Sequence, residues 1–544
     1  MGSRVAADAK HLRLDASVRA LTYIFMLLQR ADRCSHFGPY LRAIPVRHTD
    51  PMCWSAAELA LLRGSNLLPQ QRRRKSELRA DFDGTVRPLC EAFPSRYKPD
   101  VLSWQQFLWA HSSFVSRNLP LEPDANGHLR LTTGSGRAEQ RQQCLLPLLD
   151  MLNHKYAAPI IWQSGGGGAG SAPTVGLAVG EDVEAGAEIF NNYGPKSNQE
   201  LLRLYGFVLE DNPQDTFDLE VAGLAAEDEE ELQAKNQLLV QSGLPRVHFL
   251  RRSTATQASS GGVSGHTEVT GDVKSRKRQR EAVKAISVIP ASLLCVLRLA
   301  MLNQPELLML LDKLPGNTEE QGHHANQLLG APISGRSEMA ALRTLLTLLR
   351  TKLVKLQADN DTGERQLTHK EEACGTATGG DANSQNLDDA ADDDDDDDDG
   401  EVEKGTVRPC IKSAVCVYLR GQRELLQLGI TECEHLLQTV AAAATHCYSW
   451  HDWQRWYDRV DCIKWPRSAR QAGASRTRGQ HRVRVTELPH FHADQLEARA
   501  YNAYSLSVTA SALHVSMDSG VVRATSDVGA GMPHCTLTRL LVIC

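Results

Sequence analysis

The sequence "IFNNYGPKSNQELLRLYGFV" (residues 189–208) contains two Tyr-Gly pairs, separated by a segment that changes from polar to apolar. Ser197, followed three positions later by Glu200, has the spacing of a capping box, which predicts that a helix begins there. Gly206 readily adopts the left-handed conformation that ends many helices. The segment therefore predicts a short capped helix with a tyrosine near each end.

The chain before this segment changes from helical to strand-like patterns. Between residues 15 and 110, apolar residues recur mostly at helical spacing, and "WSAAELALLRG" (54–64) has Ser55 as an expected N-cap. From residue 129 onward, short apolar runs alternate with turn-forming residues, and 184–186 has the composition of a tight turn. These patterns predict a helical region followed by a region of short strands.

Leucine-rich helical patterns return after about residue 220 and are interrupted twice. Segments 285–315 and 334–356 have helical periods, and "RGQRELLQLGITECEHLLQTV" continues them. The polar stretches 252–282 and 358–405 cannot bury enough apolar surface to fold alone, which predicts two disordered insertions. Residues 441–544 have no clear period and remain unassigned.

Composition excludes several classes of protein. The chain has 544 residues and a net charge of −6, to which an unbroken acidic run at 392–399 contributes eight aspartates, so no basic field that would attract nucleic acid is expected. The apolar runs are too short for a transmembrane helix. The 13 cysteines include no Cys-x-x-Cys pair, so neither a disulfide framework nor a zinc cluster is expected, and an intracellular compartment is the default.

Two motifs at this spacing resemble those of a known family. "LLPLLDMLNH" (145–154) and "NNYGPKSNQELLRLYGFV" (191–208) resemble the C-terminal half of a SET domain. They look most like the class of plant Rubisco large-subunit lysine methyltransferases and related methyltransferases of non-histone proteins. "FGPYLRAIP" (37–45) and "WAHSSFVSRNLP" (109–120) extend the resemblance. It implies an α+β fold, in which a SET-type β-fold with a helical insertion precedes an all-helical substrate-binding domain.

The resemblance also implies domain boundaries. A SET domain would occupy residues 1–220, with the helical insertion at about 12–118 and the SET core at about 119–220. Family members begin this domain with a Gly-containing loop, which is not found before residue 15, so the domain is expected to be N-terminally incomplete. The substrate-binding domain would occupy 221–440.

The implied activity is the transfer of a methyl group from S-adenosylmethionine to a lysine of a non-histone protein. A lysine amine has a pKa near ~10.4 in water, so burial in an apolar channel must lower that pKa before the amine can attack. By its match to the family motif, Tyr193 would be the catalytic residue and would also contact the cofactor. Tyr205 and Phe207 would line the substrate channel.

Three further residues match family positions that hold S-adenosylmethionine. Arg117 would bind the carboxylate of the cofactor, because a guanidinium offers a planar pair of donors. Asn153 and His154 match the family's Asn-His pair, and no metal is implied. The expected partner is a protein substrate docked by the helical C-terminal domain of a monomer. No nucleic-acid or membrane partner is expected, and cytoplasm or nucleus is favoured over chloroplast.

Each assignment has a structural alternative. Tyr193 and Tyr205 could be half-buried core residues, Asn153 and His154 could be turn residues, and Arg117 could form a surface salt bridge. Protein-histidine methylation on the same scaffold is an alternative activity. A catalytically inactive SET scaffold that only binds a partner is an alternative from another functional class.

Overall fold

The computed structural model describes most of the chain. The described residues are 2–123, 129–131, 142–165, 174–252, 287–315, 318–374, 407–444, 447, 449–459, 515–518, 521–524 and 535–536. The predicted insertion at 252–282 lies outside them except for residue 252, and so does the remainder of the second insertion from 375 onward.

The N-terminal region is helical, as its periodicity predicts. Its core is formed by aromatic and aliphatic side chains around Tyr23, Ile24 and Phe107, all fully buried. Ser55 and Glu58 form the predicted capping box. The elements are α1 (Gly2–His11), α2 (Val18–Ala31), α3 (Gly38–Ala43), η1 (Pro51–Cys53), α4 (Ala56–Ala60), α5 (Leu67–Asp81), η2 (Phe82–Val86), α6 (Arg87–Ala92) and α7 (Trp104–Arg117).

Short antiparallel strands follow α7. One sheet has the order β2-β1-β3 and another has the order β10-β5-β4, so the last described strand pairs with the middle of the chain. Gly186 has a φ of 85°, and the backbone closes the predicted turn there. The elements are β1 (Asn118–Pro123), β2 (Leu129–Leu131), β3 (Gln142–Leu145), η4 (Leu149–Met151), β4 (Ile160–Gly165), β5 (Thr174–Val179), β10 (Cys535–Thr536) and α8 (Asn198–Tyr205).

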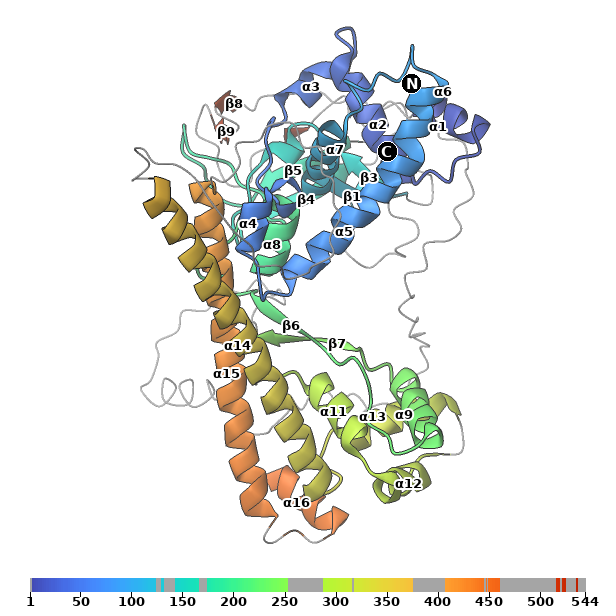
Figure 1. The fold of residues 1–544 in the computed structure, drawn as a ribbon, viewed down its shortest axis with the longest axis vertical. Helices are drawn as coiled ribbons and strands as arrows, with labels where there is room; N and C mark the ends of the chain where they lie inside the picture. Colours follow the sequence, from blue (N-terminus) through green and yellow to red (C-terminus); the bar gives the residue numbers. More distant parts are fainter. Residues whose placement is uncertain are drawn as a thin grey trace, which may run out of the picture.

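The C-terminal half is a helical body joined to a two-stranded hairpin. Figure 1 shows the long helices α14 and α15 side by side along one edge of the molecule. The hairpin β6–β7 lies between an upper body, which contains α1–α8 and β1–β5, and a lower body, which contains α9, α11, α12, α13 and α16. The elements are β6 (Thr216–Glu220), α9 (Glu229–Gln241), β7 (Val247–Arg251), α11 (Ala291–Met301), α12 (Gln304–Asp312), α13 (Thr318–Leu329), α14 (Gly335–Cys374), α15 (Pro409–Ala443), α16 (Trp450–Arg459), β8 (Val515–Asp518) and β9 (Val521–Ala524).

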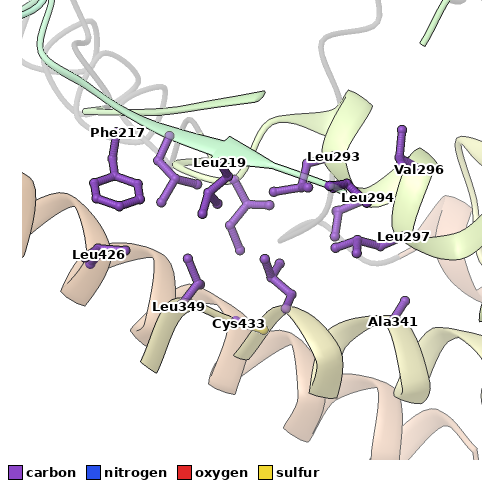
Figure 2. Packing of buried hydrophobic residues seen from close by; sticks show 14 of the residues in the cluster. Phe217, Leu219, Leu293, Leu294, Val296, Leu297, Ala341, Leu349, Leu426 and Cys433 are labelled. Carbon is purple, nitrogen blue, oxygen red and sulfur yellow. The ribbon is translucent and has the colours of Figure 1, made fainter. Parts of the chain in front are cut away.

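One apolar core joins the hairpin to these helices. Phe217 and Leu219 of β6 point toward Leu349 of α14 and Leu426 of α15, as Figure 2 shows, and all four side chains are almost completely buried. Burial of a leucine or phenylalanine side chain stabilises a fold by about 1.5–3 kcal/mol, so this layer fixes the hairpin on the helical body.

Polar contacts also connect α15 with the upper body. The guanidinium of Arg408 donates to both carboxylate oxygens of Glu58 at 2.7 and 3.0 Å. The buried hydroxyl of Tyr418 donates to the side-chain carbonyl of Gln199 on α8 at 3.0 Å. The helical body therefore supports the same short helix that the opening motif predicts.

The fold differs from the sequence prediction at residues 358–374. They were expected to begin a disordered insertion, but they continue α14 to Cys374. This stretch contains Gln, Glu, Lys and Ala, which have good helix propensities, and extending an existing helix avoids the cost of nucleation. Polarity alone was therefore a poor guide to where the helix ends.

The overall class is α+β, as predicted, with helices dominating, but the region 221–440 is not all-helical as expected, because β7 lies within it and pairs with β6. Within the described residues, no single helix is both long and apolar enough to cross a membrane. Helices α11 and α12 meet that requirement only as a pair, and they are bent by 117° relative to each other.

Candidate functional site

Helix α8 begins and ends as its sequence predicts. The Ser197 hydroxyl accepts from the Glu200 backbone N–H at 3.2 Å, and the Glu200 carboxylate accepts from the Ser197 N–H at 2.9 Å. Gly206 ends the helix with a φ of 76°. A Cβ at this position would lie 2.4–2.5 Å from backbone atoms of Thr49 and Asp50, so only glycine fits.

The two family-like segments, 145–154 and 191–208, meet at a crossing where their backbones run parallel to each other. His154 pairs with Asn191 in a parallel bridge. The Asn191 N–H donates to the Asn153 carbonyl at 2.8 Å, and the Lys155 N–H donates to the Asn191 carbonyl at 3.0 Å. The crossing therefore places Tyr193 directly beside His154, although 38 residues separate the two segments that carry Asn153 and Asn191.

Four rings form a closed group at this crossing, which we call the aromatic cluster: His154, Tyr193, Tyr205 and Phe207. The ring centroids of Tyr193 and Tyr205 lie 4.7 Å apart, and His154 stacks on Tyr193 at 5.0 Å. Phe207 lies 6.1 Å from both Tyr205 and His154. The structure therefore brings together both predicted tyrosines, the predicted histidine and the predicted phenylalanine.

The hydroxyl of Tyr193 has a fixed direction. It donates to the Leu152 carbonyl at 2.8 Å. Burial raises the pKa of Tyr193 to about 12, so the phenol keeps its proton at neutral pH and cannot serve as a general base. Its oxygen lone pairs remain available as acceptors for an incoming N–H group.

A cavity of about 1750 Å³ opens beside the aromatic cluster. Tyr193 and Tyr205 line it, and so does Arg117 at the end of α7. Asn153, His154 and Phe207 are not among its lining residues. The predicted site residues thus divide into three that line the cavity and three that do not.

An ion pair between a half-buried arginine and a buried aspartate, which we call the Arg117–Asp150 corner, lines the same cavity. The Arg117 Nη1 donates to the Asp150 backbone carbonyl at 3.1 Å and lies 3.7 Å from its carboxylate oxygen Oδ2. The Tyr40 hydroxyl donates to the same Oδ2. Among the described residues, the Arg117 Nε and the Asp150 Oδ1 are buried without a hydrogen-bond partner. Arg117 is therefore part of the cavity wall and not of a surface salt bridge.

Burial changes the ionisation of this corner. It raises the pKa of Asp150 to about 6, and the nearby Arg117 charge only partly opposes that rise. The pKa of the Tyr40 phenol is raised too, by its burial and by the adjacent carboxylate. A carboxyl group with a perturbed pKa in a cavity wall, as Asp150 has here, is characteristic of functional sites.

Asn153 and His154 have other contacts. The exposed Asn153 side chain donates to the Glu188 carboxylate at 2.8 Å. The Nδ1 of His154 accepts from the Tyr193 backbone N–H at 3.1 Å, and burial lowers the pKa of the ring, so both observations describe a neutral imidazole. These side chains hold the crossing in place around Tyr193.

Asp150 in the cavity wall and its partner Tyr40 were not predicted from the sequence. Both lie inside quoted motifs, "LLPLLDMLNH" and "FGPYLRAIP", but nothing in either motif indicates that they meet. A carboxylate within an apolar run was the available signal, because a buried acid requires partners. Within the described part of the chain, no group of three or more His, Cys, Asp or Glu side chains is placed to hold a metal ion.

Several proteins of known function are similar to part of this chain, although no protein-family model matches it. It is 54% identical over 183 residues to "Ribosomal lysine N-methyltransferase set10" of Schizosaccharomyces pombe, covering 34% of this chain and 30% of that protein. It is 29% identical over 225 residues to "Ribosomal lysine N-methyltransferase 1" of Saccharomyces cerevisiae, covering 34% of each. "N-lysine methyltransferase SETD6" of Homo sapiens is 27% identical over 196 residues, covering 34% of this chain and 38% of that protein.

The chain spans about a third of the length of these curated relatives. Over that part, the predicted resemblance to SET-domain lysine methyltransferases is confirmed. Among solved structures, the SET domain of LSMT bound to lysine and AdoHcy aligns with a TM-score of 0.49 and 16% identity, covering 81% of this chain and 80% of that one. Rubisco LSMT bound to AdoMet aligns with a TM-score of 0.47 and 15% identity, covering 87% and 86%.

Proposed function

We propose that this protein transfers a methyl group from S-adenosylmethionine to the side-chain amine of a lysine in a protein substrate. The observation that carries the proposal is that Tyr193, Tyr205 and the Arg117–Asp150 corner line one cavity. The names of the three relatives, all lysine methyltransferases, support the same activity.

The aromatic cluster suits a lysine amine that has lost its proton. Ring faces offer little solvation to an ammonium ion compared with water, so burial beside Tyr193 and Tyr205 lowers the pKa of the amine. The Tyr193 oxygen can accept an N–H of the amine, because its own proton is committed to Leu152. This hydrogen bond leaves the single lone pair of the amine nitrogen directed at the methyl donor. Orientation of this kind accounts for much of the expected rate acceleration.

The Arg117–Asp150 corner suits the amino-acid end of S-adenosylmethionine. The Nε of Arg117 and the Oδ1 of Asp150 lack partners among the described residues but are shielded from water, so a small rotation of each side chain would let Nε donate to a carboxylate and Oδ1 accept from an ammonium group. Each buried polar atom is costly while it lacks a partner, so binding such a ligand removes that cost. The cofactor supplies an electrophilic methyl group, and these side chains bind and orient its charged end.

We further propose that the substrate protein docks on the C-terminal half, residues 221–440. Phe249 and Arg251 of β7 line the same cavity as the tyrosines. Phe249 is 40% exposed, which is unusual for a phenylalanine in a paired strand. A polypeptide crossing the hairpin would therefore reach the tyrosines within one continuous cavity.

Two measurements test the proposed function. Titration calorimetry of the full chain with S-adenosylmethionine is expected to detect saturable binding at a single site. Release of S-adenosylhomocysteine in the presence of lysine-containing proteins is expected to depend on the substrate and on time. Binding without release would favour a scaffold, and the absence of both would contradict the proposal.

A further inference from the structure

We propose that Arg203 on α8, together with Arg74 on α5, forms a subsite for an acidic side chain that lies close to the target lysine in the substrate. This inference rests on the proposed methyl transfer and adds a sequence preference to it. Arg203 would be a specificity-determining residue and not a catalytic one.

The position of Arg203 links it to the reaction site. It lies two residues before Tyr205 on the same short helix, and both residues line the cavity. Arg74 and Gln71 line it from α5. An extended peptide advances about 3.3 Å per residue, so a subsite in this cavity corresponds to a position within about three residues of the lysine.

The charge on Arg203 is not neutralised by a close partner. Among the described residues, its guanidinium has no hydrogen bond and no ion pair, although the side chain is largely screened from water. The two acids nearest in the fold are already engaged: Glu200 caps α8 through Ser197, and Asp218 accepts from Gln199 at 2.8 Å. Burial lowers the pKa of Arg203, and the negative charges of Glu200 and Asp218 only partly oppose that shift.

A second unpaired polar atom lies in the wall of the same cavity. The Gln71 side chain is 3% exposed, and among the described residues its Oε1 has no hydrogen-bond partner. Among the described residues, Arg74 has one ion-pair partner, the Glu77 carboxylate at 3.1 Å, which leaves other guanidinium N–H groups to donate. The region between α5 and α8 thus offers several N–H donors to a bound carboxylate.

The balance of charge around the cavity favours an anionic occupant. Cationic side chains outnumber acidic ones in the lining: Arg19, Arg73, Arg74, Arg117, Lys196, Arg203 and Arg251 against Glu77, Asp150, Glu200 and Asp218. A guanidinium matches a carboxylate in shape, because two parallel N–H groups meet two oxygens. An aspartate or glutamate near the lysine provides that carboxylate on the same polypeptide. A nucleic acid would instead require a stripe of cations along a surface.

Peptides that contain one lysine test this inference directly. An aspartate is placed in turn at each position within about three residues of the lysine, and matched peptides carry alanine or arginine there. Methylation is followed as kcat/KM, and affinity is measured separately by fluorescence anisotropy of labelled peptides. The wild-type chain is expected to prefer aspartate over alanine by about tenfold at one or two positions.

Charge variants of Arg203 identify the residue responsible. Arg203→Glu is expected to abolish the preference for aspartate and to favour arginine at the same position, whereas Arg203→Lys retains part of the preference. Arg203→Met removes the charge but keeps a long side chain. It tests the role of the charge even if a glutamate at this half-buried position prevents folding. Arg72→Glu is the matched control, because Arg72 is exposed on α5 and does not line the cavity.

The outcomes separate this inference from the proposed function. Equal use of all peptides by the wild type, or an unchanged preference in Arg203→Glu, would overturn the subsite while leaving methyl transfer intact. If the wild type methylates no peptide, the anisotropy series still decides whether acidic peptides bind through Arg203. Tighter Arg203-dependent binding of a single-stranded RNA than of acidic peptides would also overturn the proposal.

Discussion

The aromatic cluster and the Arg117–Asp150 corner border the same cavity but differ in whether their polar atoms have hydrogen-bond partners within the protein. In the aromatic cluster, the Tyr193 hydroxyl and the His154 Nδ1 each have a partner within the protein. In the corner, the half-buried Arg117 and the fully buried Asp150 side chain each have one buried polar atom without a partner among the described residues. Apart from the Tyr205 hydroxyl, the polar groups of the aromatic cluster have partners within the protein, whereas the corner leaves two polar atoms of charged side chains for a ligand to pair with.

This difference matches two kinds of task. A reacting amine has to meet a surface that is already in the right geometry, because any reorganisation during the reaction would raise the barrier. A charged cofactor end instead supplies binding energy, and unpaired buried groups increase the energy gained on binding. We therefore expect changes in the aromatic cluster to alter turnover and changes in the corner to alter affinity.

Removing the Tyr193 hydroxyl gives the largest expected effect. Tyr193→Phe keeps the ring but loses the oxygen that would orient the amine, so kcat is expected to fall by about 100-fold or more, while the affinity for S-adenosylmethionine changes little. S-adenosylhomocysteine release and calorimetry measure the two quantities.

Tyr97→Phe is the matched control for this change. It removes another buried phenol, which donates to Asp8 at 2.6 Å outside the cavity. A similar loss of turnover in both variants would indicate a general loss of structure. Full activity in Tyr193→Phe would remove the catalytic role of Tyr193.

The two glycines of the motif test whether the aromatic wall is fixed by the backbone. Gly206→Ala is expected to lower the free energy of unfolding by about 2 kcal/mol or more, because it combines a left-handed φ with a clash against Thr49 and Asp50. Gly194→Ala also has a left-handed φ, of 89°, but a Cβ there meets open space, so a loss of about 1 kcal/mol is expected. Denaturant unfolding of both variants measures the difference, and equal losses would contradict the close packing at Gly206.

The sequence correctly predicted where helix α8, which carries Tyr205, begins and ends. Ser197, Glu200 and Gly206 act within one helix, so their spacing alone specified where α8 begins and ends. The resemblance to a known family also selected Tyr193, Tyr205 and the other rings, which do lie together.

The contacts between residues far apart in the sequence could not be predicted from residue spacing. The burial of Asp150 depends on Tyr40, which is 110 residues earlier, and on its place in the cavity wall. Local patterns give no information on such contacts. Likewise, the outward position of the Asn153 side chain follows from the parallel crossing with Asn191, and no pattern within either segment predicts it.

The ionisation of Asp150 provides a test of the corner through pH. Its pKa in the folded protein, about 6, is raised above the ordinary value of 3.8. The folded state therefore holds this proton more tightly than the unfolded state, and the contribution of Asp150 to stability decreases as the pH rises from about 4 to 6. The ionised carboxylate of Asp150 attracts an ammonium group and accepts its hydrogen bonds. The protonated carboxyl group has lost the negative charge and binds an ammonium group more weakly.

The affinity for S-adenosylmethionine is accordingly expected to fall by up to about tenfold per pH unit as the pH drops below about 6. Asp150→Asn should bind more weakly and lose this dependence, while Tyr193→Phe should retain it. Calorimetry across this range measures both effects. A pH-independent affinity in the wild type would mean that Asp150 does not contact the cofactor.

The smallest expected effect distinguishes the two phenols within the aromatic cluster. The Tyr193 hydroxyl is held by the Leu152 carbonyl, whereas the Tyr205 hydroxyl has no hydrogen-bond partner among the described residues. Tyr205→Phe keeps the ring that faces Tyr193 at 4.7 Å and removes only the unfixed oxygen, so kcat/KM is expected to change by less than about fivefold. Tyr205→Ala removes the ring and should lower kcat/KM much further. If Tyr205→Phe were as damaging as Tyr193→Phe, both hydroxyls would contact the amine, and the cluster would act as a pair of acceptors instead of one acceptor beside an apolar wall.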